Sequence, residues 1–367
     1  MATDTWTGGS GSWGVASNWS GDNGTPGVPV VTDDVVIDTA GITVTVGSGV
    51  AAVCHTLSDT NATLSITGGT LFTVERAIFN GAFIETAGTF TMSGYGANFD
   101  QSMTMLGGSM NVLSGAANIY DGGTLAGTIS GAGALNLING TTYIDSGFAC
   151  TIASIVVGAQ GGKLAFNTNF SYGNDFTLLQ NGVLDIFGHT LTLTGGSLLE
   201  GTVGYGKIVQ SGGNAAMTIG NGQNYTVFDN GLILSIGAHA QQDGNLALGA
   251  NDSGAKLQIG KGGVYDIAGN WNIADPSSIG TITNAGVFAK DGGGKTSAIF
   301  SSFTSTGQLE VQIGTVLLEG LVNSVSGTVS GGGTLGIGGG RTTFGANVVL
   351  ESAALNQISG VLVLNKA

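Results

Sequence analysis

The sequence is poor in charged residues, and this scarcity excludes several classes of protein. Only 9% of its 367 residues are charged, against roughly 25% in ordinary globular proteins. The long charged side chains that solubilise helical surfaces are replaced by Thr, Ser and Asn, which a β surface tolerates better than a helical one. Hydrophobic residues still make up 42% of the chain, so it can bury a core and does not have a disordered composition.

Basic residues are especially scarce. The chain has nine Lys and Arg against 23 Asp and Glu, for a net charge of −14. This balance makes phosphate-backbone binding unfavourable, so we expect no nucleic-acid partner. The charge is also uneven, because residues 1–162 contain 11 acidic residues and only Arg76, whereas 163–367 contain 12 acidic and eight basic residues. The two halves therefore differ in electrostatic potential.

Long hydrophobic runs and cysteines are scarce as well. The chain contains no run of about 18 apolar residues, the length that a helix needs to cross a bilayer, so we expect no membrane insertion. The opening Met1-Ala2-Thr3-Asp4 lacks the basic and apolar segments of a secretory signal. Cys54 and Cys150 fall about four turns apart in the repeat described below, farther than the roughly 7 Å that a disulfide spans. We expect both to be free, buried thiols.

Glycine, in contrast, is in excess, with 68 residues. It recurs in a short unit: a Gly or other small residue, any residue, an apolar residue, an outward residue and a fifth position that is usually apolar. The spacing of successive units is mostly about 20 to 29 residues, which is a typical repeat length of solenoid proteins. The units occupy 62–66, 88–92, 108–112, 133–137, 162–166, 182–186, 206–210, 231–235, 255–259, 263–267, 286–290, 307–311, 333–337 and 360–364.

This repeat predicts stacked strands. Alternation of apolar and outward residues is typical of a strand with one buried face, and the flanking glycines allow the chain to turn at each corner. Helical spacing is absent, and glycine costs about 1 kcal/mol per helical position. A sandwich or barrel would show closer turn signals, roughly every 8 to 12 residues. We therefore predict an all-β right-handed parallel β-helix (β-solenoid) of about 13 coils.

The two ends of the chain differ. Residues 1–50 contain three of the four tryptophans and two predicted strands, at 34–38 and 42–46, and we predict that they form a capping lead-in to a solenoid over 51–367. The last predicted strand, Val361 to Leu364, has no comparable cap. We expect an open strand edge there.

Three segments resemble known proteins. Gly182 to Gly196 and Val325 to Gly340 are similar to the passenger regions of bacterial autotransporters and haemagglutinin-like adhesins, and Trp6 to Ile37 resembles the lead-in of bacterial surface β-helix proteins. The resemblance implies a pectin-lyase-like solenoid that is exported and serves in adhesion, coating or polymer formation. We thus expect a cell-surface or extracellular protein, exported without a recognisable N-terminal signal peptide.

Catalytic and metal-binding residues are few. Glycan cleavage needs two carboxylates about 5 to 9.5 Å apart, and the outward position of Asp185 has Ala165 and Val209 as its expected neighbours. We therefore expect no carboxylate pair among the outward positions of successive units, and no enzymatic activity. We also expect no cofactor, although oxygen ligands for one calcium ion could come from a small acidic group. Its members are Asp22, Asp33 and Asp34.

These observations favour a structural subunit that polymerises head-to-tail into a filament, because an open edge recruits strands. The expected partner is thus a second copy of the chain. The contact is predicted to join the aromatic N-terminal segment to the last strand, through Trp6, Trp13, Trp19, Val361, Leu362, Val363 and Leu364. Two alternatives remain: a monomeric adhesin rod that binds glycans or surfaces, and a polysaccharide-degrading enzyme.

Overall fold

The fold is an all-β parallel solenoid with about 1% helix and about 16 turns, which confirms the predicted fold class. The computed structural model describes residues 2–21, 24–212, 215–222, 225–249, 253–276, 279–351 and 353–365. The chain divides into two compact units, Met1–Thr168 and Asn169–Ala367.

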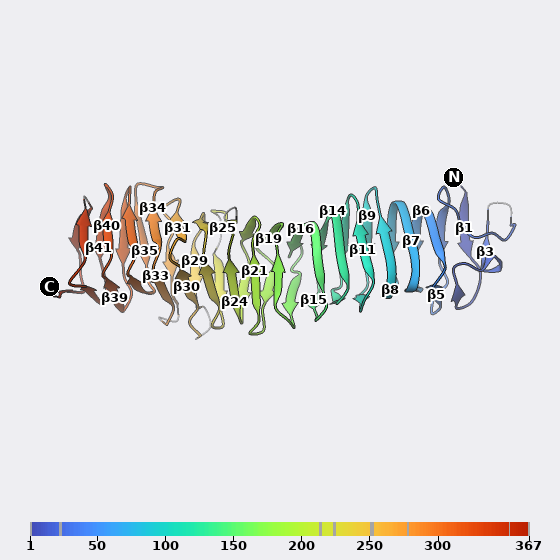
Figure 1. Cartoon of the computed structure of the whole chain (residues 1–367), viewed down its shortest axis with the longest axis horizontal. Coiled ribbons are helices and arrows are strands. Elements are labelled where there is room, and N and C mark those ends of the chain that lie inside the picture. The colour runs from blue at the N-terminus through green and yellow to red at the C-terminus, as the bar shows by residue number, and fades with distance from the viewer. Residues whose placement is uncertain are drawn as a thin grey trace. The chain divides into compact units, whose positions relative to one another are not determined.

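In the first unit, strands from successive turns pair in parallel and form three columns, drawn in blue to green in Figure 1. Val44, Leu64, Phe83 and Met103 are successive partners in one column. Their spacing gives a turn of roughly 20 residues, at the short end of the range for solenoid repeats. The parallel pairing already includes Asp34–Ile37 and Thr43–Val46, which precede residue 51.

Several strands of the first unit are long and bend from one column into the next, so that β6, β7 and β8 each pair in more than one column. One helical element, the 3-10 turn η1 (Ala16–Asn18), lies in the N-terminal segment. The strands are β1 (Thr3–Trp6), β2 (Gly11–Ser12), β3 (Trp19–Ser20), β4 (Asp34–Ile37), β5 (Thr43–Val46), β6 (Ala51–Asp59), β7 (Thr63–Phe79), β8 (Phe83–Met92), β9 (Gly96–Phe99), β10 (Met103–Met105), β11 (Ser109–Val112), β12 (Ala116–Ile119), β13 (Gly123–Leu125), β14 (Thr128–Leu137), β15 (Thr141–Ile144), β16 (Ala149–Val157) and β17 (Lys163–Phe166).

The second unit is also built from three columns of parallel strands. The first column is β18 (Phe170–Tyr172), β21 (Thr190–Leu193), β24 (Lys207–Gln210), β27 (Ile233–Ile236), β30 (Lys256–Ile259), β33 (Thr281–Asn284), β36 (Ser302–Ser305), β39 (Val322–Val325), β42 (Arg341–Phe344) and β45 (Val361–Leu364). The second is β19 (Asp175–Leu178), β22 (Ser197–Leu199), β25 (Ala216–Ile219), β28 (His239–Gln242), β31 (Val264–Ile267), β34 (Val287–Lys290), β37 (Gln308–Val311), β40 (Thr328–Ser330) and β43 (Val349–Glu351). The third is β20 (Val183–Asp185), β23 (Thr202–Gly204), β26 (Thr226–Asp229), β29 (Leu246–Leu248), β32 (Ile273–Ala274), β35 (Thr296–Ile299), β38 (Thr315–Leu318), β41 (Thr334–Ile337) and β44 (Ala354–Gln357).

The number of turns is larger than the predicted 13 because the recurrent glycine units do not share one column. Phe90 and Met110 are partners on β8 and β11, but Leu135 of the following unit pairs with Ala117 in another column. Consecutive units are therefore not always one turn apart. Counting units along the sequence misses turns.

The interior of the first unit is filled from all three columns. Four buried phenylalanines meet there: Phe79, Phe83, Phe90 and Phe99. The centroid of the Phe79 ring lies 5.1 Å from those of Phe83 and Phe99, and Phe99 stacks on it at 15°. Ring pairs of this kind add about 1 kcal/mol each beyond the buried area. They tie the columns to one another.

Glycine serves a second purpose besides turning the chain. A Cβ atom at Gly123, whose φ is +152°, would lie 1.9 Å from the carbonyl oxygen of Met103 in the preceding turn. A Cβ at Gly81 would lie 1.7 Å from the carbonyl oxygen of Ala62. No side chain fits at either position. Glycine therefore allows successive turns to approach each other closely, which contributes to the high glycine content.

Two acidic side chains are fully buried in the interior of the first unit. Glu85 lies between Ile66 and Met105 in its column, and burial raises its pKa to about 8 although it accepts a hydrogen bond from the Ser109 backbone N–H at 2.9 Å. Burial also raises the pKa of Asp59, to about 6. Both carboxyls are therefore held in an environment that disfavours their charged form.

Candidate functional site

The N-terminal segment forms a cap whose centre is aromatic. Trp6, Trp13 and Trp19 are fully buried, and the ring of Trp19 lies edge-on to the other two with centroids 4.8 and 4.7 Å away. The indole N–H of Trp19 donates to the Trp13 carbonyl at 2.7 Å. The structure thus corrects the assignment of these three side chains to a subunit contact. Their large apolar area is used inside the cap, and they offer no surface to a partner.

The cap also ends the parallel ladder of the first unit. β3 pairs with β1 in the antiparallel direction, whereas β4 pairs with the other side of β1 in parallel. Short strands of this kind protect a sheet edge from adding further strands. On its surface the cap exposes Val15, Val30 and Val31. These three define the cap valines.

The last described strands, β43, β44 and β45, form the C-terminal edge. Within the described residues, each pairs with a single neighbour. Leu355 is 39% exposed, whereas its register partner Leu335 is 1% exposed, and Leu364 is 68% exposed against 1% for its partner Phe344. The side chains of the last strands therefore occupy positions that are buried one turn earlier, but no further turn among the described residues covers them.

The sequence-predicted residues of the last strand lie within this C-terminal edge. Val361 and Leu364 are exposed, and Leu362 and Val363 are half-buried. Hydrogen bonding to β42 satisfies one side of the strand. The four residues therefore combine an apolar surface with a strand edge that has no second partner among the described residues.

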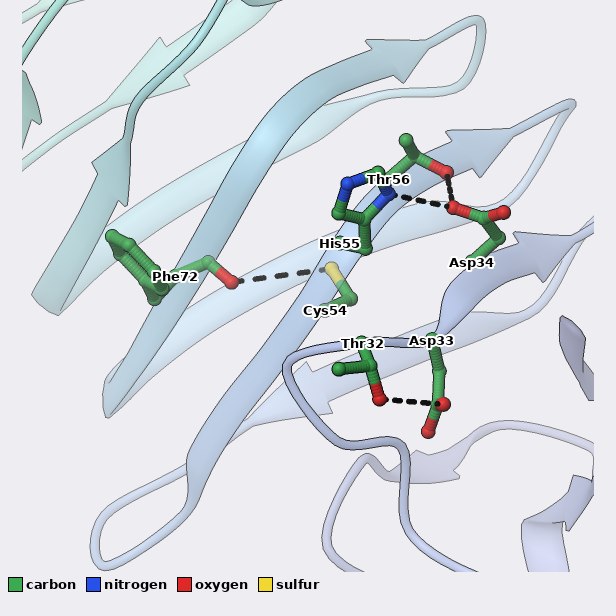
Figure 2. Close-up of polar contacts among 7 residues, drawn as sticks. All are labelled: Thr32, Asp33, Asp34, Cys54, His55, Thr56 and Phe72. Carbon is green, nitrogen blue, oxygen red and sulfur yellow. Dashed lines mark hydrogen bonds and ion pairs between the residues drawn. The ribbon is translucent and has the colours of Figure 1, made fainter. Parts of the chain in front are cut away.

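Of the three calcium candidates, the two in the described residues, Asp33 and Asp34, direct their carboxylates to different partners. Figure 2 shows the Asp34 carboxylate directed to Thr56 and His55, and that of Asp33 directed to Thr32. The Thr56 hydroxyl donates to Asp34 at 2.6 Å, and this bond together with His55 lowers the pKa of Asp34. Among the described residues, no three His, Cys, Asp or Glu side chains form a metal-binding group. Asp22 lies outside the described residues, so the calcium site stays a prediction.

Neither cysteine is in a disulfide. Cys54 is buried with its sulfur 4.0 Å from the Phe72 carbonyl oxygen, as Figure 2 shows, and Cys150 is half-buried. Burial raises the pKa of Cys54 strongly and that of Cys150 to about 11.

We expect the folded protein to react with a thiol reagent such as dithionitrobenzoate at least about tenfold more slowly than free cysteine, because the thiolate is the reactive form. Absorbance at pH 8 in native buffer measures the rate, and the same measurement in denaturant is the control. Rapid release of two equivalents from the native protein would contradict this placement of the thiols.

A pair of carboxyls that the sequence did not reveal lies in the second unit. Asp266 on β31 is buried, and burial together with the charge of the nearby Asp291 raises its pKa. Lys290 is buried beside them and donates to the carbonyl oxygens of Gly269 and Gly292. The pair can share a proton. The expected absence of carboxylate pairs was argued only for the row of Asp185, and Asp185 pairs with Gly204 and not with Val209.

A groove of about 420 Å³ lies on the side of the first unit. It is lined by Arg76 on β7, Tyr95, Asn98 on β9, Asn118 on β12 and Tyr120. Asn98 and Asn118 are register partners, and the Asn118 amide donates to the Asn98 oxygen at 2.9 Å. This bond holds the two amides side by side at the base of the groove.

Sequence reasoning missed this groove although a signal exists. The dipeptide Ala97-Asn98 recurs as Ala117-Asn118 one turn later in the first unit. The ladder continues with Asn136, whose amide donates to the Asn118 oxygen at 2.8 Å. A repeated polar residue at the turn length therefore marks a row of stacked amides.

Comparison with known proteins gives no relative: no family model, curated protein or solved structure matches the chain. No helix of the described residues is long and apolar enough to span a membrane. The function is therefore argued from the structure itself.

Proposed function

We propose that the protein is a structural subunit, extracellular or at a cell surface, that assembles head-to-tail with further copies of itself. The observation that carries the proposal is the C-terminal edge. There, apolar side chains such as Leu355 and Leu364 occupy positions that are buried one turn earlier and are exposed, beside strand edges that have no partner among the described residues. Covering one such side chain stabilises a contact by about 1.5 to 3 kcal/mol.

The acceptor in the next copy is the N-terminal cap. Its exposed surface includes Val15, Val30 and Val31, and β5 is the only strand that pairs with β2 among the described residues. The tryptophans support this surface from inside. A head-to-tail contact between two different surfaces produces a filament when its rotation does not close into a ring. Both halves of the chain carry net negative charge, so screening by salt should favour assembly.

Negative-stain electron microscopy and sedimentation velocity of the purified protein test this proposal. We expect filaments that lengthen with protein concentration and with salt. Leu355→Asp or Leu364→Asp places a charge in the contact, and we expect assembly to need at least about tenfold more protein, equivalent to about 1.4 kcal/mol per contact. Val31→Asp on the cap should weaken assembly as well.

The matched control is Leu106→Asp in the first unit, which changes a leucine whose exposure of 58% lies between those of Leu355 and Leu364. We expect it to assemble as the unchanged protein does. A protein that stays monomeric at high concentration would overturn the proposal. A closed dimer that responds to Leu364→Asp but not to Val31→Asp would instead indicate contact between two C-terminal edges, and would overturn the head-to-tail arrangement.

The second candidate function is a monomeric adhesin rod that binds glycans. The observation that favours it is the groove lined by Arg76, Tyr95 and Tyr120, because such residues recur in binding sites. Sedimentation as a monomer together with glycan binding would support this function over polymerisation. For the third alternative, a polysaccharide-degrading enzyme, the Asp266 and Asp291 pair is the place to test, by assaying depolymerisation of acidic and neutral glycans.

A further inference from the structure

We propose that the groove formed by Arg76, Tyr95, Asn98, Asn118 and Tyr120 binds an oligosaccharide that carries isolated carboxylate groups, such as uronic acids. Its residues belong to the first unit and include none of the cap valines, whereas the C-terminal edge belongs to the second unit. The inference therefore does not depend on self-association. It is carried by three features of the groove, which supply stacking, hydrogen bonding and charge.

The first feature is aromatic surface. Tyr95 is 76% exposed, the highest value among the exposed large hydrophobic side chains of the described residues, and Tyr120 is half-buried on the same groove. Exposing a tyrosine to this extent leaves a large apolar ring in water with no packing gain. Aromatic rings of this kind stack on the apolar faces of sugar rings and keep the hydroxyl end in solvent. The two tyrosines thus provide stacking surfaces.

The second feature is the row of amides. Asn98, Asn118 and Asn136 are bonded to one another in sequence, at 2.9 and 2.8 Å. A side-chain amide has two N–H donors and an oxygen with two lone pairs, so each member keeps hydrogen-bonding capacity toward the groove. Successive strands are about 4.8 Å apart. The row therefore offers regularly spaced donors and acceptors of fixed orientation, which suits the repeated hydroxyls of a saccharide chain.

The third feature is the guanidinium group of Arg76. Arg76 is exposed, is the sole basic residue among positions 1–162, and makes neither an ion pair nor a side-chain hydrogen bond within the described residues. Its planar guanidinium can bind a carboxylate through two parallel hydrogen bonds. An unpaired arginine between stacking and hydrogen-bonding side chains indicates a ligand that carries a negative charge.

The surrounding charge narrows the class of ligand. Positions 1–162 carry a net charge of −10, which repels densely charged polyanions such as nucleic acids or heavily sulfated glycans. A saccharide in which carboxylates are separated by neutral sugars satisfies Arg76 with less repulsion. Binding of such a ligand should therefore tolerate moderate salt, since screening weakens both the attraction and the repulsion.

Isothermal titration calorimetry with a hyaluronan hexasaccharide, in which every second sugar is a glucuronate, tests the inference. The carboxyl-reduced hexasaccharide and a polygalacturonate fragment, charged at every sugar, are the comparison ligands. We expect the hyaluronan fragment to bind at least about tenfold more tightly than its reduced form, since a charge-assisted pair contributes about 1.5 to 3 kcal/mol. We also expect the polygalacturonate fragment to bind more weakly than hyaluronan.

The variants separate the three features. Arg76→Gln should remove the preference for the carboxylate and leave affinity for the reduced ligand within about twofold. Tyr95→Ala should weaken both ligands at least about tenfold, because it removes the more exposed of the two aromatic rings on which the sugars stack. Tyr143→Ala, an exposed tyrosine of the same unit that does not line the groove, is the matched control and should bind as the unchanged protein does.

All three substituted side chains are exposed, so thermal unfolding followed by circular dichroism should be unchanged. If none of the three ligands binds, the inference is overturned. Equal affinity for the acidic and reduced ligands, or equal losses for Tyr95→Ala and Tyr143→Ala, would do so as well. None of these outcomes depends on whether the protein forms filaments.

Discussion

Replacing Trp19 with alanine is expected to destabilise the first unit by about 3 to 5 kcal/mol, the usual cost of truncating a buried tryptophan. Trp19 contacts the rings of both Trp6 and Trp13 and donates a hydrogen bond to the Trp13 carbonyl. Alanine therefore removes the centre of the cap and leaves that carbonyl without its donor. Loss of the cap uncovers the first turn, which then has an exposed apolar end.

Urea unfolding followed by far-ultraviolet circular dichroism measures the effect on the first unit. Trp271→Ala is the matched control, because Trp271 is the remaining tryptophan and is only half-buried. We expect it to cost about 1 kcal/mol, typical of a partly exposed position. If Trp19→Ala lowers the free energy of unfolding by no more than the control does, the cap does not stabilise the end of the solenoid.

Raising the pH from 4.5 to 8 is expected to lower the stability of the protein because of Glu85. Its pKa is near 8 in the folded protein and near its ordinary value of 4.5 in the unfolded chain. Between these values the unfolded chain has lost a proton that the folded protein keeps, so unfolding becomes more favourable by about 1.4 kcal/mol per pH unit. The contribution is complete below pH 4.5 and is lost as the pH approaches 8, for a total on the order of 4 kcal/mol.

Glu85→Gln should remove the Glu85 part of this dependence, leaving the smaller parts of other raised carboxyls such as Asp59, and be more stable than the unchanged protein at pH 8. The Gln oxygen can still accept from the Ser109 N–H, and Oε2 of Glu85 has no partner among the described residues. Asp59→Asn is the contrasting variant, because both oxygens of Asp59 accept backbone N–H groups, from Ala62 and Gly81. An amide must turn its NH2 toward one of these donors, so this variant should be less stable at every pH.

Chemical denaturation at pH 5 and pH 8 gives the required free energies. Stability that is constant or rises across this range would contradict the burial of an uncharged Glu85. A loss of stability in Glu85→Gln at pH 8 would contradict it equally, because the substitution keeps the shape and removes only the charge.

The local pattern of the sequence was sufficient to predict strands, corners and parallel stacking. In a strand such as Phe83-Ile84-Glu85, every second side chain points into the interior, whichever residues the neighbouring turn places beside it. Glu85 follows the same alternation into the interior, although its burial was not predicted from the sequence. Glycine spacing gave the corners. Fold class therefore depends on short-range information, which a single sequence carries.

Side-by-side contacts could not be predicted in the same way, because they depend on the register between turns of unequal length. Asp185 was expected beside Val209 and pairs with Gly204, and the same uncertainty concealed the approach of Asp291 to Asp266. An error of a few residues in turn length changes every neighbour in the row. The burial of Trp19 was likewise undecided, because a cluster of aromatics is equally typical of an inner core and of a contact surface.

The regular turn length of the first unit limits how this chain can vary in evolution. Each strand of a column bonds only to the strands before and after it, so a whole turn can be gained or lost by duplication or deletion while the remaining ladder stays intact. A change of one residue within a strand would instead reverse the inward and outward faces beyond it. Viable length variants should therefore differ by whole turns. The N-terminal cap and the C-terminal edge can be retained whatever the number of turns between them.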